Sequence, residues 1–152
     1  MDITCEIIFV FYVIICLRIK NKLMESKKVE IILTTLDAMP QLKSTFKSLK
    51  ESNYKNFKII IQDGGSIDGT LDYIKSQKKF FDIDLISSLD SGVAQASVRA
   101  LKRASKNDFI VFLAADEKIE KNFFDIHLSY FNENPNLLVT YGSVLLFDPK
   151  KN

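Results

Sequence analysis

The sequence has few of the residues that build cross-linked or metal-held proteins. It contains two cysteines, Cys5 and Cys16, and a single histidine, His127, among 152 residues. No CxxC pair occurs and His127 is distant from both cysteines in sequence, so a disulfide framework or a structural zinc site is not expected. This cysteine usage fits a reducing compartment.

Glycine, proline and an excess of one charge are also scarce. Five glycines and three prolines exclude collagen-like repeats and leave no Pro/Gly-rich linker that would mark a second domain. The chain is 47% hydrophobic and 26% charged, as globular proteins are, and its length accommodates one domain. The formal net charge of +2 gives no basic excess, so a nucleic-acid partner is not predicted.

The N-terminus carries an apolar segment. Residues 3–17 read ITCEIIFVFYVIICL, and Arg18, Lys20 and Lys22 follow. The run is shorter than the roughly 20 residues of a spanning helix, and it lacks the basic start and cleavage site of a secretory signal. We expect residues 1–23 to form a separate segment. Three interpretations stay open: a marginal anchor that holds a cytoplasmic protein at the cytosolic membrane face, a core helix, or an extension upstream of a true start at Met24.

Apolar runs of strand length alternate with helical patterns from Val29 onward. Strands are expected at 29–33, 57–61, 83–86, 109–113, 137–141 and 144–147. Helices are expected at 41–52, 69–79, 93–105 and 123–134, the third with Ala94, Val98 and Leu101 in register on one stripe. Repeated β-α units need crossover helices. The sequence therefore predicts an α/β fold over residues 29–149, a mostly parallel sheet with helices on both faces.

Ligands of such sheets bind outside the carboxyl ends of the strands, which directs attention to the loops there. The loop after the second strand reads QDGGSIDGT (62–70). Gly64 and Gly65 allow a tight turn, Ser66 or Asp68 can cap the next helix, and the Asp63 carboxylate could accept a hydrogen bond from a base or ribose. A plain strand-to-helix turn uses the same residue types, so both interpretations stay open. The dinucleotide fingerprint GxGxxG and the P-loop are absent.

The loop after the fourth strand carries two adjacent acids, Asp116 and Glu117, in the sequence LAADE (113–117). Oxygen ligands at the end of an apolar strand suit Mg²⁺ or Mn²⁺, and such an ion could bridge a diphosphate. The alternative is an acid pair that interacts with a helix N-terminus.

Four ordered blocks carry a family resemblance: VEIILTTLD (29–37), IIIQDGGSIDGT (59–70), LDSGVAQASVRALKRAS (89–105) and NDFIVFLAADE (107–117). Together they resemble the nucleotide-sugar-binding half of family 2 glycosyltransferases, which have the Rossmann-like GT-A fold. The resemblance implies inverting, metal-dependent sugar transfer from a nucleotide-diphosphate-sugar donor to a saccharide, lipid or protein acceptor, as in polysaccharide biosynthesis. It implies donor binding by Thr35, Asp37, Asp63, Asp90, Gly92 and Arg99, and binding of Mg²⁺ or Mn²⁺ by Asp116 and Glu117.

The chain also departs from the family pattern. Ala114 occupies the first acid position of the DxD-type motif, and Leu36 replaces the usual aromatic residue of the first loop. Gln95 and Val98 stand where related members carry aspartate and asparagine. The family's catalytic base lies in the acceptor-binding half, downstream of the region that the blocks cover, so no catalytic residue is assigned. A second interpretation therefore stays open, in which the chain is an inactive or truncated donor-domain fragment that acts as a binding partner.

Overall fold

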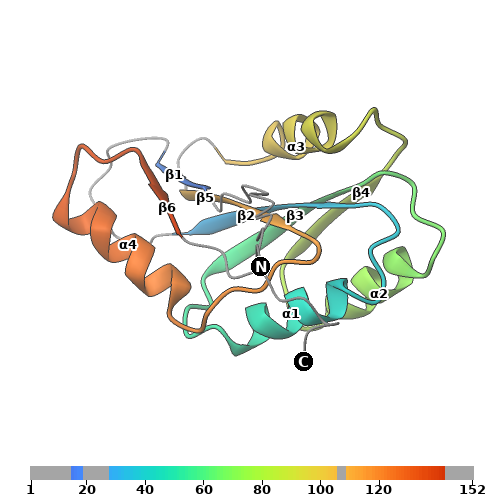
Figure 1. Ribbon diagram of the computed structural model, residues 1–152, viewed down its shortest axis with the longest axis horizontal. Coiled ribbons are helices and arrows are strands. Elements are labelled where there is room, and N and C mark those ends of the chain that lie inside the picture. Colours follow the sequence, from blue (N-terminus) through green and yellow to red (C-terminus); the bar gives the residue numbers. More distant parts are fainter. Residues whose placement is uncertain (1–14, 19–27, 106–108, 143–152) are drawn as a thin grey trace, which may run out of the picture.

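The computed structural model describes residues 15–18, 28–105 and 109–142, which form one six-stranded sheet with four helices among them (Figure 1). The strand order is β4-β3-β2-β5-β1-β6. In chain order the elements are β1 (Ile15–Arg18), β2 (Val29–Thr35), α1 (Leu42–Glu51), β3 (Phe57–Asp63), α2 (Thr70–Gln77), β4 (Ile83–Ser87), α3 (Val93–Leu101), β5 (Phe109–Ala114), α4 (Phe123–Glu133) and β6 (Val139–Tyr141).

Four adjacent strands, β4, β3, β2 and β5, are parallel, which confirms the predicted fold class. β2 lies between β3 and β5, and β4 pairs with the outer side of β3. These strands coincide with the four apolar runs expected between residues 29 and 113. β2, β3 and β5 lie within the sheet and are mostly buried on both faces, which explains their many isoleucine, valine and leucine residues, whereas the edge strand β4 is only partly buried. The run at 144–147 lies outside the described residues.

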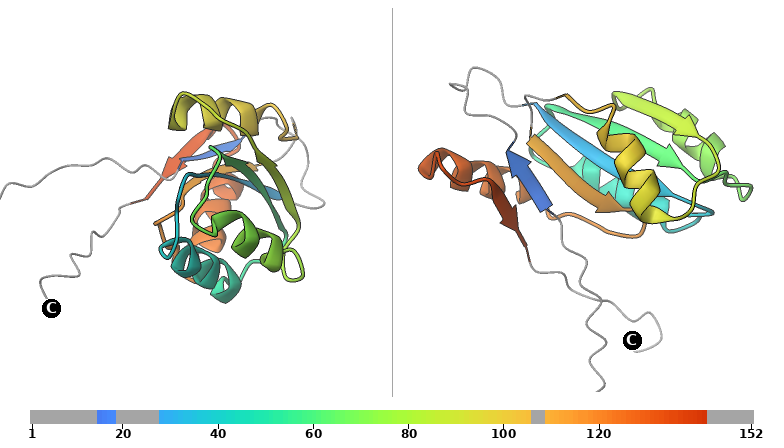
Figure 2. Two further views of the ribbon diagram at one scale, coloured as in Figure 1. Left: turned by 90° about the vertical axis from the view of Figure 1, so that its right-hand side faces the viewer. Right: turned by 90° about the horizontal axis from the view of Figure 1, so that it is seen from above.

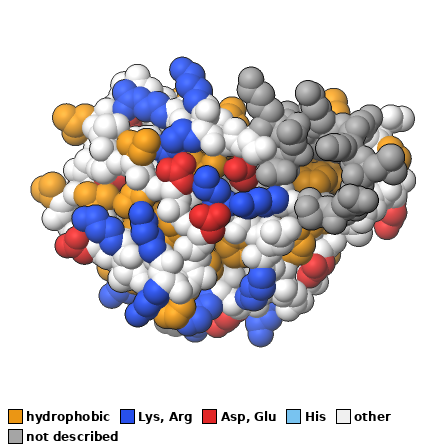
Figure 3. Space-filling view, turned by 180° about the vertical axis from the view of Figure 1, so that it is seen from behind, with side chains coloured by type: hydrophobic (Ala, Val, Ile, Leu, Met, Phe, Trp, Pro, Cys, Tyr) orange, Lys and Arg blue, Asp and Glu red, His pale blue; other side chains and the backbone are white. Residues whose placement is uncertain are grey.

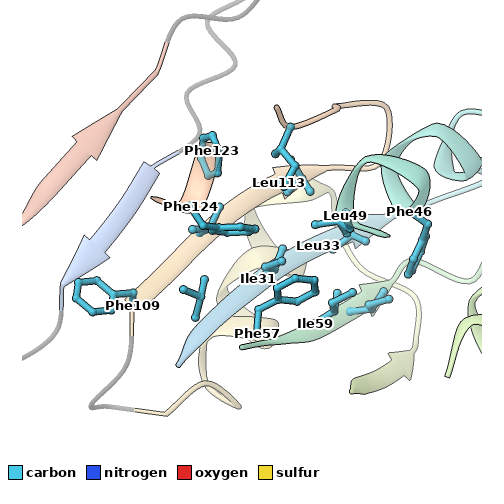
Figure 4. Packing of buried hydrophobic residues seen from close by; sticks show 14 of the residues in the cluster. Ile31, Leu33, Phe46, Leu49, Phe57, Ile59, Phe109, Leu113, Phe123 and Phe124 are labelled. Atoms are coloured by element: carbon cyan, nitrogen blue, oxygen red, sulfur yellow. The ribbon is translucent and has the colours of Figure 1, made fainter. Parts of the chain in front are cut away.

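Helices cover both faces of the sheet, as predicted. α1, α2 and α4 lie on one face and α3 lies alone on the other (Figures 1 and 2). The larger core forms beneath α1 and α4, where the side chains of Phe46, Leu49 and Phe124 meet those of Ile31 and Leu33 (Figure 4). Each such buried side chain contributes roughly 1.5–3 kcal/mol. This core fixes the strand ends from which the candidate site is built.

The face of α3 that packs on the sheet differs from the predicted one. Ala96 and Ala100 are buried, whereas Ala94 is exposed and Val98 and Leu101 keep 52% and 38% of their surface accessible. The second, smaller core consists of Ala100 with the branched side chains of Ile32, Ile60 and Ile110. A helix that rests on a branched sheet surface approaches closely through alanine, so the small residues and not the larger ones face inward.

β1 was not expected as a strand. It lies between β5 and β6 and pairs antiparallel with both, with Cys16 opposite Val111 and Thr140. The structure thus places residues 15–17, the end of the apolar run, inside the sheet, and the predicted boundaries of the N-terminal segment stay a prediction. Residues 1–14 and 19–27 lie outside the described part of the chain. Within that part, none of the helices combines the length and the apolar character that crossing a bilayer requires.

Candidate functional site

The loops that carry the predicted site residues emerge at one edge of the sheet. The strand register places Thr35 beside Asp63 and Thr34 beside Ala114, so β2, β3 and β5 end at the same level. Loops 36–41, 64–69 and 115–122 follow these ends, and loop 88–92 follows the parallel strand β4. In Figure 1 the loops after β2, β3 and β4 lie on the right-hand side. We call this side of the sheet the carboxyl edge.

Asp63 is the structural centre of these loops. Its side chain is completely buried, and its carboxylate accepts hydrogen bonds from several segments of the chain. Oδ1 accepts from Thr35 Oγ1 at 2.9 Å and from Ser66 Oγ at 2.5 Å. Oδ2 accepts from the amides of Gly65 and Ser66, both at 2.9 Å, and from Ser87 Oγ at 2.7 Å. The carboxylate thereby joins the ends of β2, β3 and β4.

The hydrogen bonds to Asp63 keep it ionised. Burial by itself raises the pKa of this carboxyl, but the hydrogen bonds from Ser66, Ser87 and Gly65 outweigh burial and hold the pKa below its ordinary value. In this structure the carboxylate faces protein donors on both oxygens. That Asp63 itself contacts a nucleotide stays a prediction. Its hydrogen bonds in this structure hold the surrounding strand ends and the loop after β3 in place.

Asp37 joins the loop after β2 to the loop after β3. It adopts the left-handed conformation with φ of 44°, which aspartate tolerates better than most residues. Its Oδ1 accepts from the amide of Ile67 at 2.8 Å, while its own amide donates to Ser66 Oγ at 2.8 Å. Further bonds run from the amide of Ala38 to Thr70 Oγ1 and from the amide of Met39 to Asp68 Oδ2. Loops 36–41 and 64–69 are therefore held together as one rim of the site.

Asp90 lies against this rim from the loop after β4. A Cβ atom at Gly64 would be 3.4 Å from Asp90 Oδ2, so the absence of a side chain at position 64 lets the carboxylate approach. The other oxygen, Oδ1, accepts from the amide of Gly92 at 2.9 Å, where Gly92 has φ of 118° and precedes α3. Asp90 thus lies beside the Asp63 loop, as the prediction requires.

Arg99, on α3, stabilises the loop after β4. Its guanidinium donates to the carbonyl of Leu89 at 2.8 Å and to Ser88 Oγ at 3.2 Å. Arg103, which the sequence did not single out, donates to the carbonyl of Ile61 at 2.7 Å and so holds the end of β3. Both arginines therefore position loops through contacts within the protein, and donor contact by Arg99 stays a prediction.

Asp116 and Glu117 follow β5 and differ in environment. Asp116 is exposed and makes no hydrogen bond or ion pair with any residue of the described ranges, whereas Glu117 Oε2 accepts from the amide of Ala114 at 2.7 Å. Burial and the neighbouring Asp116 raise the pKa of Glu117, while the amide of Ala114 acts in the opposite direction. Thr45 of α1 fixes the turn by donating to the carbonyl of Ala115 at 2.7 Å.

These two acids fit a cation that is shared with a ligand. Mg²⁺ commonly takes one or two carboxylates and completes its coordination with phosphate oxygens and water. Asp116 presents a carboxylate without a protein partner, and one oxygen of Glu117 makes no hydrogen bond within the described ranges. The described residues contain no cluster of three or more acidic, histidine or cysteine side chains that could hold a metal alone. Asp116 and Glu117 suit a diphosphate-bound ion better than a cage built from protein alone.

The sequence indicated Ser66 only as a possible helix cap, whereas its hydroxyl donates to Asp63. Sequence reasoning missed the hydroxyl groups of Ser87 and Ser88. Ser87 Oγ, at the end of β4, donates to Asp63, and Ser88 Oγ accepts from Gln62 Nε2 at 3.1 Å. Serines after a strand carry no motif of their own. Only the pairing of β3 with β4, which places Ser87 opposite Asp63, reveals their function.

The fold and the loop arrangement define a class: an α/β domain whose candidate site lies at the carboxyl edge of a parallel sheet. The chain matches the family described as "Glycosyl transferase family 2" over residues 30–150. It therefore belongs to glycosyltransferase family 2, as the four sequence blocks predicted.

Two curated relatives agree with this assignment. A putative teichuronic acid biosynthesis glycosyltransferase of Bacillus subtilis, TuaG, is 28% identical over 107 residues, which is 69% of this chain and 42% of the relative. An uncharacterized glycosyltransferase of Rickettsia bellii is 24% identical over 128 residues, or 84% of this chain and 18% of the relative. The chain thus spans less than half the length of either.

Solved structures share the fold. S. aureus TarS (residues 1–349) superposes with a TM-score of 0.67 at 20% identity, covering 71% of this chain and 33% of TarS. A mannosyltransferase from Pyrobaculum calidifontis, PcManGT, solved with GDP-Man and Mn²⁺, has a TM-score of 0.61 at 19% identity and covers 68% of this chain and 32% of that protein. TarS has also been solved with UDP-GlcNAc. These likenesses confirm the GT-A fold.

Proposed function

We propose that this chain binds a nucleotide-diphosphate-sugar at the carboxyl edge and serves as the donor-binding part of a metal-dependent, inverting glycosyltransferase. The observation that carries the proposal is the convergence of the loops after β2, β3 and β4 on the buried carboxylate of Asp63. A preorganised rim of this kind fixes a ligand without further ordering of the loops, which lowers the entropic cost of binding. The nucleotide-sugar complexes of TarS and PcManGT support a donor of this chemical class.

In the proposed reaction an acceptor hydroxyl attacks the anomeric carbon of the donor sugar. The new bond forms between the acceptor oxygen and that carbon, the bond from the carbon to the diphosphate breaks, and a base takes the hydroxyl proton. Attack opposite to the leaving group inverts the configuration. The residues described here orient the donor, while the base and the acceptor contacts belong to the acceptor-binding half that the family resemblance implies.

Asp116 and Glu117 would hold the divalent cation, Mg²⁺ or Mn²⁺. When bound, such an ion supplies positive charge that stabilises the diphosphate as it departs. Asp116 supports this assignment more strongly than Glu117, because its carboxylate is exposed and has no partner among the described residues, whereas Glu117 Oε2 accepts a hydrogen bond from the amide of Ala114.

A second candidate is a donor-domain fragment that binds nucleotide without turnover and acts with a partner protein. Ala114 favours this candidate, because it removes one acid from the DxD-type position at the end of β5. The chain also spans only 18–42% of its two curated relatives, so the acceptor, the activity of the whole protein and its membrane location at the cytosolic face are proposals as well.

Calorimetric titration tests the donor site. UDP and GDP are titrated into the full chain with and without Mn²⁺, and into the variants Asp116→Ala and Asp125→Ala. Asp125 is an exposed acid on α4, away from the carboxyl edge, and serves as the matched control. We expect binding of at least one nucleotide that requires Mn²⁺, is lost in Asp116→Ala and is retained in Asp125→Ala. Equal binding with and without Mn²⁺, or no binding of either nucleotide, would contradict the proposal.

A further inference from the structure

The side of the sheet opposite the site carries a cluster of lysines around an exposed aromatic ring. α1 and α2 connect parallel strands, so both begin at the carboxyl edge and end at the opposite side, which we call the amino edge. Lys50 lies in the last turn of α1, and Lys78 and Lys79 follow α2. Lys55 Nζ donates to the carbonyl of Lys50 at 2.6 Å. We call Lys50, Lys55, Lys78, Lys79 and Phe80 the amino-edge patch.

Phe80 is the centre of the amino-edge patch. The Nζ atoms of Lys50 and Lys79 lie 4.2 Å and 4.9 Å from the centroid of its ring, and 52% of the residue is exposed. The adjacent Phe81 instead packs into the core against Phe46 and Phe57. The half-exposed ring of Phe80 thus forms an apolar surface with the positive charges of Lys50 and Lys79 directly beside it.

The acids near the amino edge pair with lysines outside the patch. Glu51 lies 3.9 Å from Lys47 and Asp82 lies 3.5 Å from Lys28. Within the described ranges no carboxylate forms an ion pair with a lysine of the patch. In Figure 3 many lysine and arginine side chains lie along the lower margin of the molecule, the side of α1 and α2, with a few acidic side chains among them.

The helix dipole explains only part of this arrangement. A lysine in the last turn of a helix stabilises the negative end of the dipole, which accounts for Lys50 and for one of the lysines after α2. It does not account for Lys55, which lies in the loop before β3, or for the exposure of Phe80. These features favour an external anionic partner.

We propose that the amino-edge patch binds the surface of an anionic lipid bilayer, with Phe80 at the level of the headgroups and the carboxyl edge facing away. Clustered lysines attract a surface of anionic headgroups, and the patch contains no arginine of the kind that grips single phosphates in two-point contacts. The seven-residue strands β2 and β3 span about 23 Å, which separates the donor site from the bilayer by roughly that distance.

The charge of the whole chain favours a bilayer over a nucleic acid. The formal net charge is only +2, so the chain lacks the general basic excess of nucleic-acid-binding proteins and its positive charge is local to the patch. β1 runs antiparallel to β5 and therefore begins on the side of the carboxyl edge. The proposal thus rests on the amino-edge patch and not on the apolar residues that precede β1 in sequence.

Vesicle co-sedimentation of the full chain tests this proposal. The vesicles contain phosphatidylcholine alone or with phosphatidylglycerol, at low and at physiological salt. We expect binding to the anionic vesicles only, and weaker binding at the higher salt, where charges are screened beyond about 8 Å. Lys50→Gln and Lys79→Gln should each lower the partition coefficient about five-fold, and Phe80→Ala should lower it further. Lys43→Gln, an exposed lysine in the first turn of α1 at the carboxyl edge, is the matched control and should change nothing.

Three outcomes would overturn the proposal: equal binding to neutral vesicles, unchanged binding of the Lys50→Gln/Lys79→Gln double variant, or binding of polyuridylate in the absence of vesicle binding. Circular dichroism of each variant shows whether it is folded. Nucleotide titration of the same variants distinguishes this proposal from the proposed function. Variants of the patch that no longer bind vesicles should still bind nucleotide. If the wild type binds no nucleotide, its binding to anionic vesicles still tests the patch.

Discussion

At the scale of the residue, the site depends on one buried carboxylate. Asp63 accepts five hydrogen bonds from four residues, and three of these bonds come from hydroxyl groups. Removing a buried charged acceptor leaves its donors unsatisfied, which costs more than the hydrogen bonds were worth in the folded state. Asp63 therefore contributes to folding first and to ligand binding through the loops that it positions.

Substitution of Asp63 should lower the stability of the domain. We expect Asp63→Ala to reduce the free energy of unfolding by about 3–5 kcal/mol, and Asp63→Asn by less, because an amide can donate to hydroxyl groups that rotate to accept. Chemical denaturation followed by circular dichroism measures both. An Asp63→Ala variant with unchanged stability and weaker nucleotide binding would instead indicate a direct ligand contact.

The pH dependence of stability provides a second test of Asp63. Because its folded pKa is lowered, its contribution to stability is complete above the pKa of the unfolded chain, about 3.9, and is lost as the pH falls through the folded value. The wild type should therefore lose stability below about pH 4 more steeply than Asp63→Asn does. Denaturation midpoints measured across the acidic range check this, and parallel curves for the two proteins would refute it.

At the scale of the element, β1 decides whether the sheet is complete. It joins β5 to β6 and lies upstream of Met24, so a chain that started at Met24 would lack it. We expect removal of residues 1–23 to leave an open, apolar edge on β5 and to cause aggregation or a lower unfolding temperature. Removal of residues 2–14 keeps β1 and is the control.

Thermal unfolding and light scattering of the two truncated chains measure this effect. If the chain that starts at Met24 is as stable and as monomeric as the full chain, β1 does not contribute to the sheet in solution. In that case the earlier interpretation of residues 1–23 as a separate segment would hold.

The elements also show how far sequence reasoning reached. Long apolar runs such as residues 29–33 and 109–113 predicted the strands correctly, since only central strands of a parallel sheet are so uniformly apolar. β1 escaped prediction because a strand within a longer apolar run cannot be distinguished from an anchor by pattern alone. The prediction that Val98 and Leu101 lie on the buried face of α3 was wrong, because the helix packs closely on the sheet and only the small side chain of alanine fits there.

The position of the loops was predictable, but their internal contacts were not. The loops that carry Asp63, Asp90 and Asp116 follow parallel strands, as the expected order of elements requires, and ligand binding by these residues stays a prediction. The role of Asp63 as an acceptor for Ser66 and Ser87 depends on residues up to 24 positions apart, and only the strand register brings them together. The contact of His127 also depends on tertiary structure. Its Nδ1 lies 2.8 Å from Thr140 Oγ1, and this hydrogen bond connects α4 to β6.

At the scale of the whole molecule, the two edges of the sheet differ in their exposed charges. Exposed carboxylates, among them Asp37, Asp68 and Asp116, lie at the carboxyl edge, and the lysines of the amino-edge patch, which form no ion pair within the described ranges, lie at the opposite edge. Negative charge at the site repels a free diphosphate unless a cation is present. This arrangement gives a physical reason for metal-dependent donor binding, and it lets the same molecule contact an anionic surface through its other end.

The location of the metal tests this account most directly. Mn²⁺ broadens the NMR signals of nearby amides, so it can be added to the ¹⁵N-labelled full chain in the presence of UDP and then of GDP. We predict that the amides of residues 114–118 and of the Asp63 loop lose their signals first, and that Asp116→Ala abolishes the effect. Broadening centred on other exposed acids, such as Asp72 or Asp125, or no localised broadening with either nucleotide, would contradict the proposal that Asp116 binds a cation at a donor site.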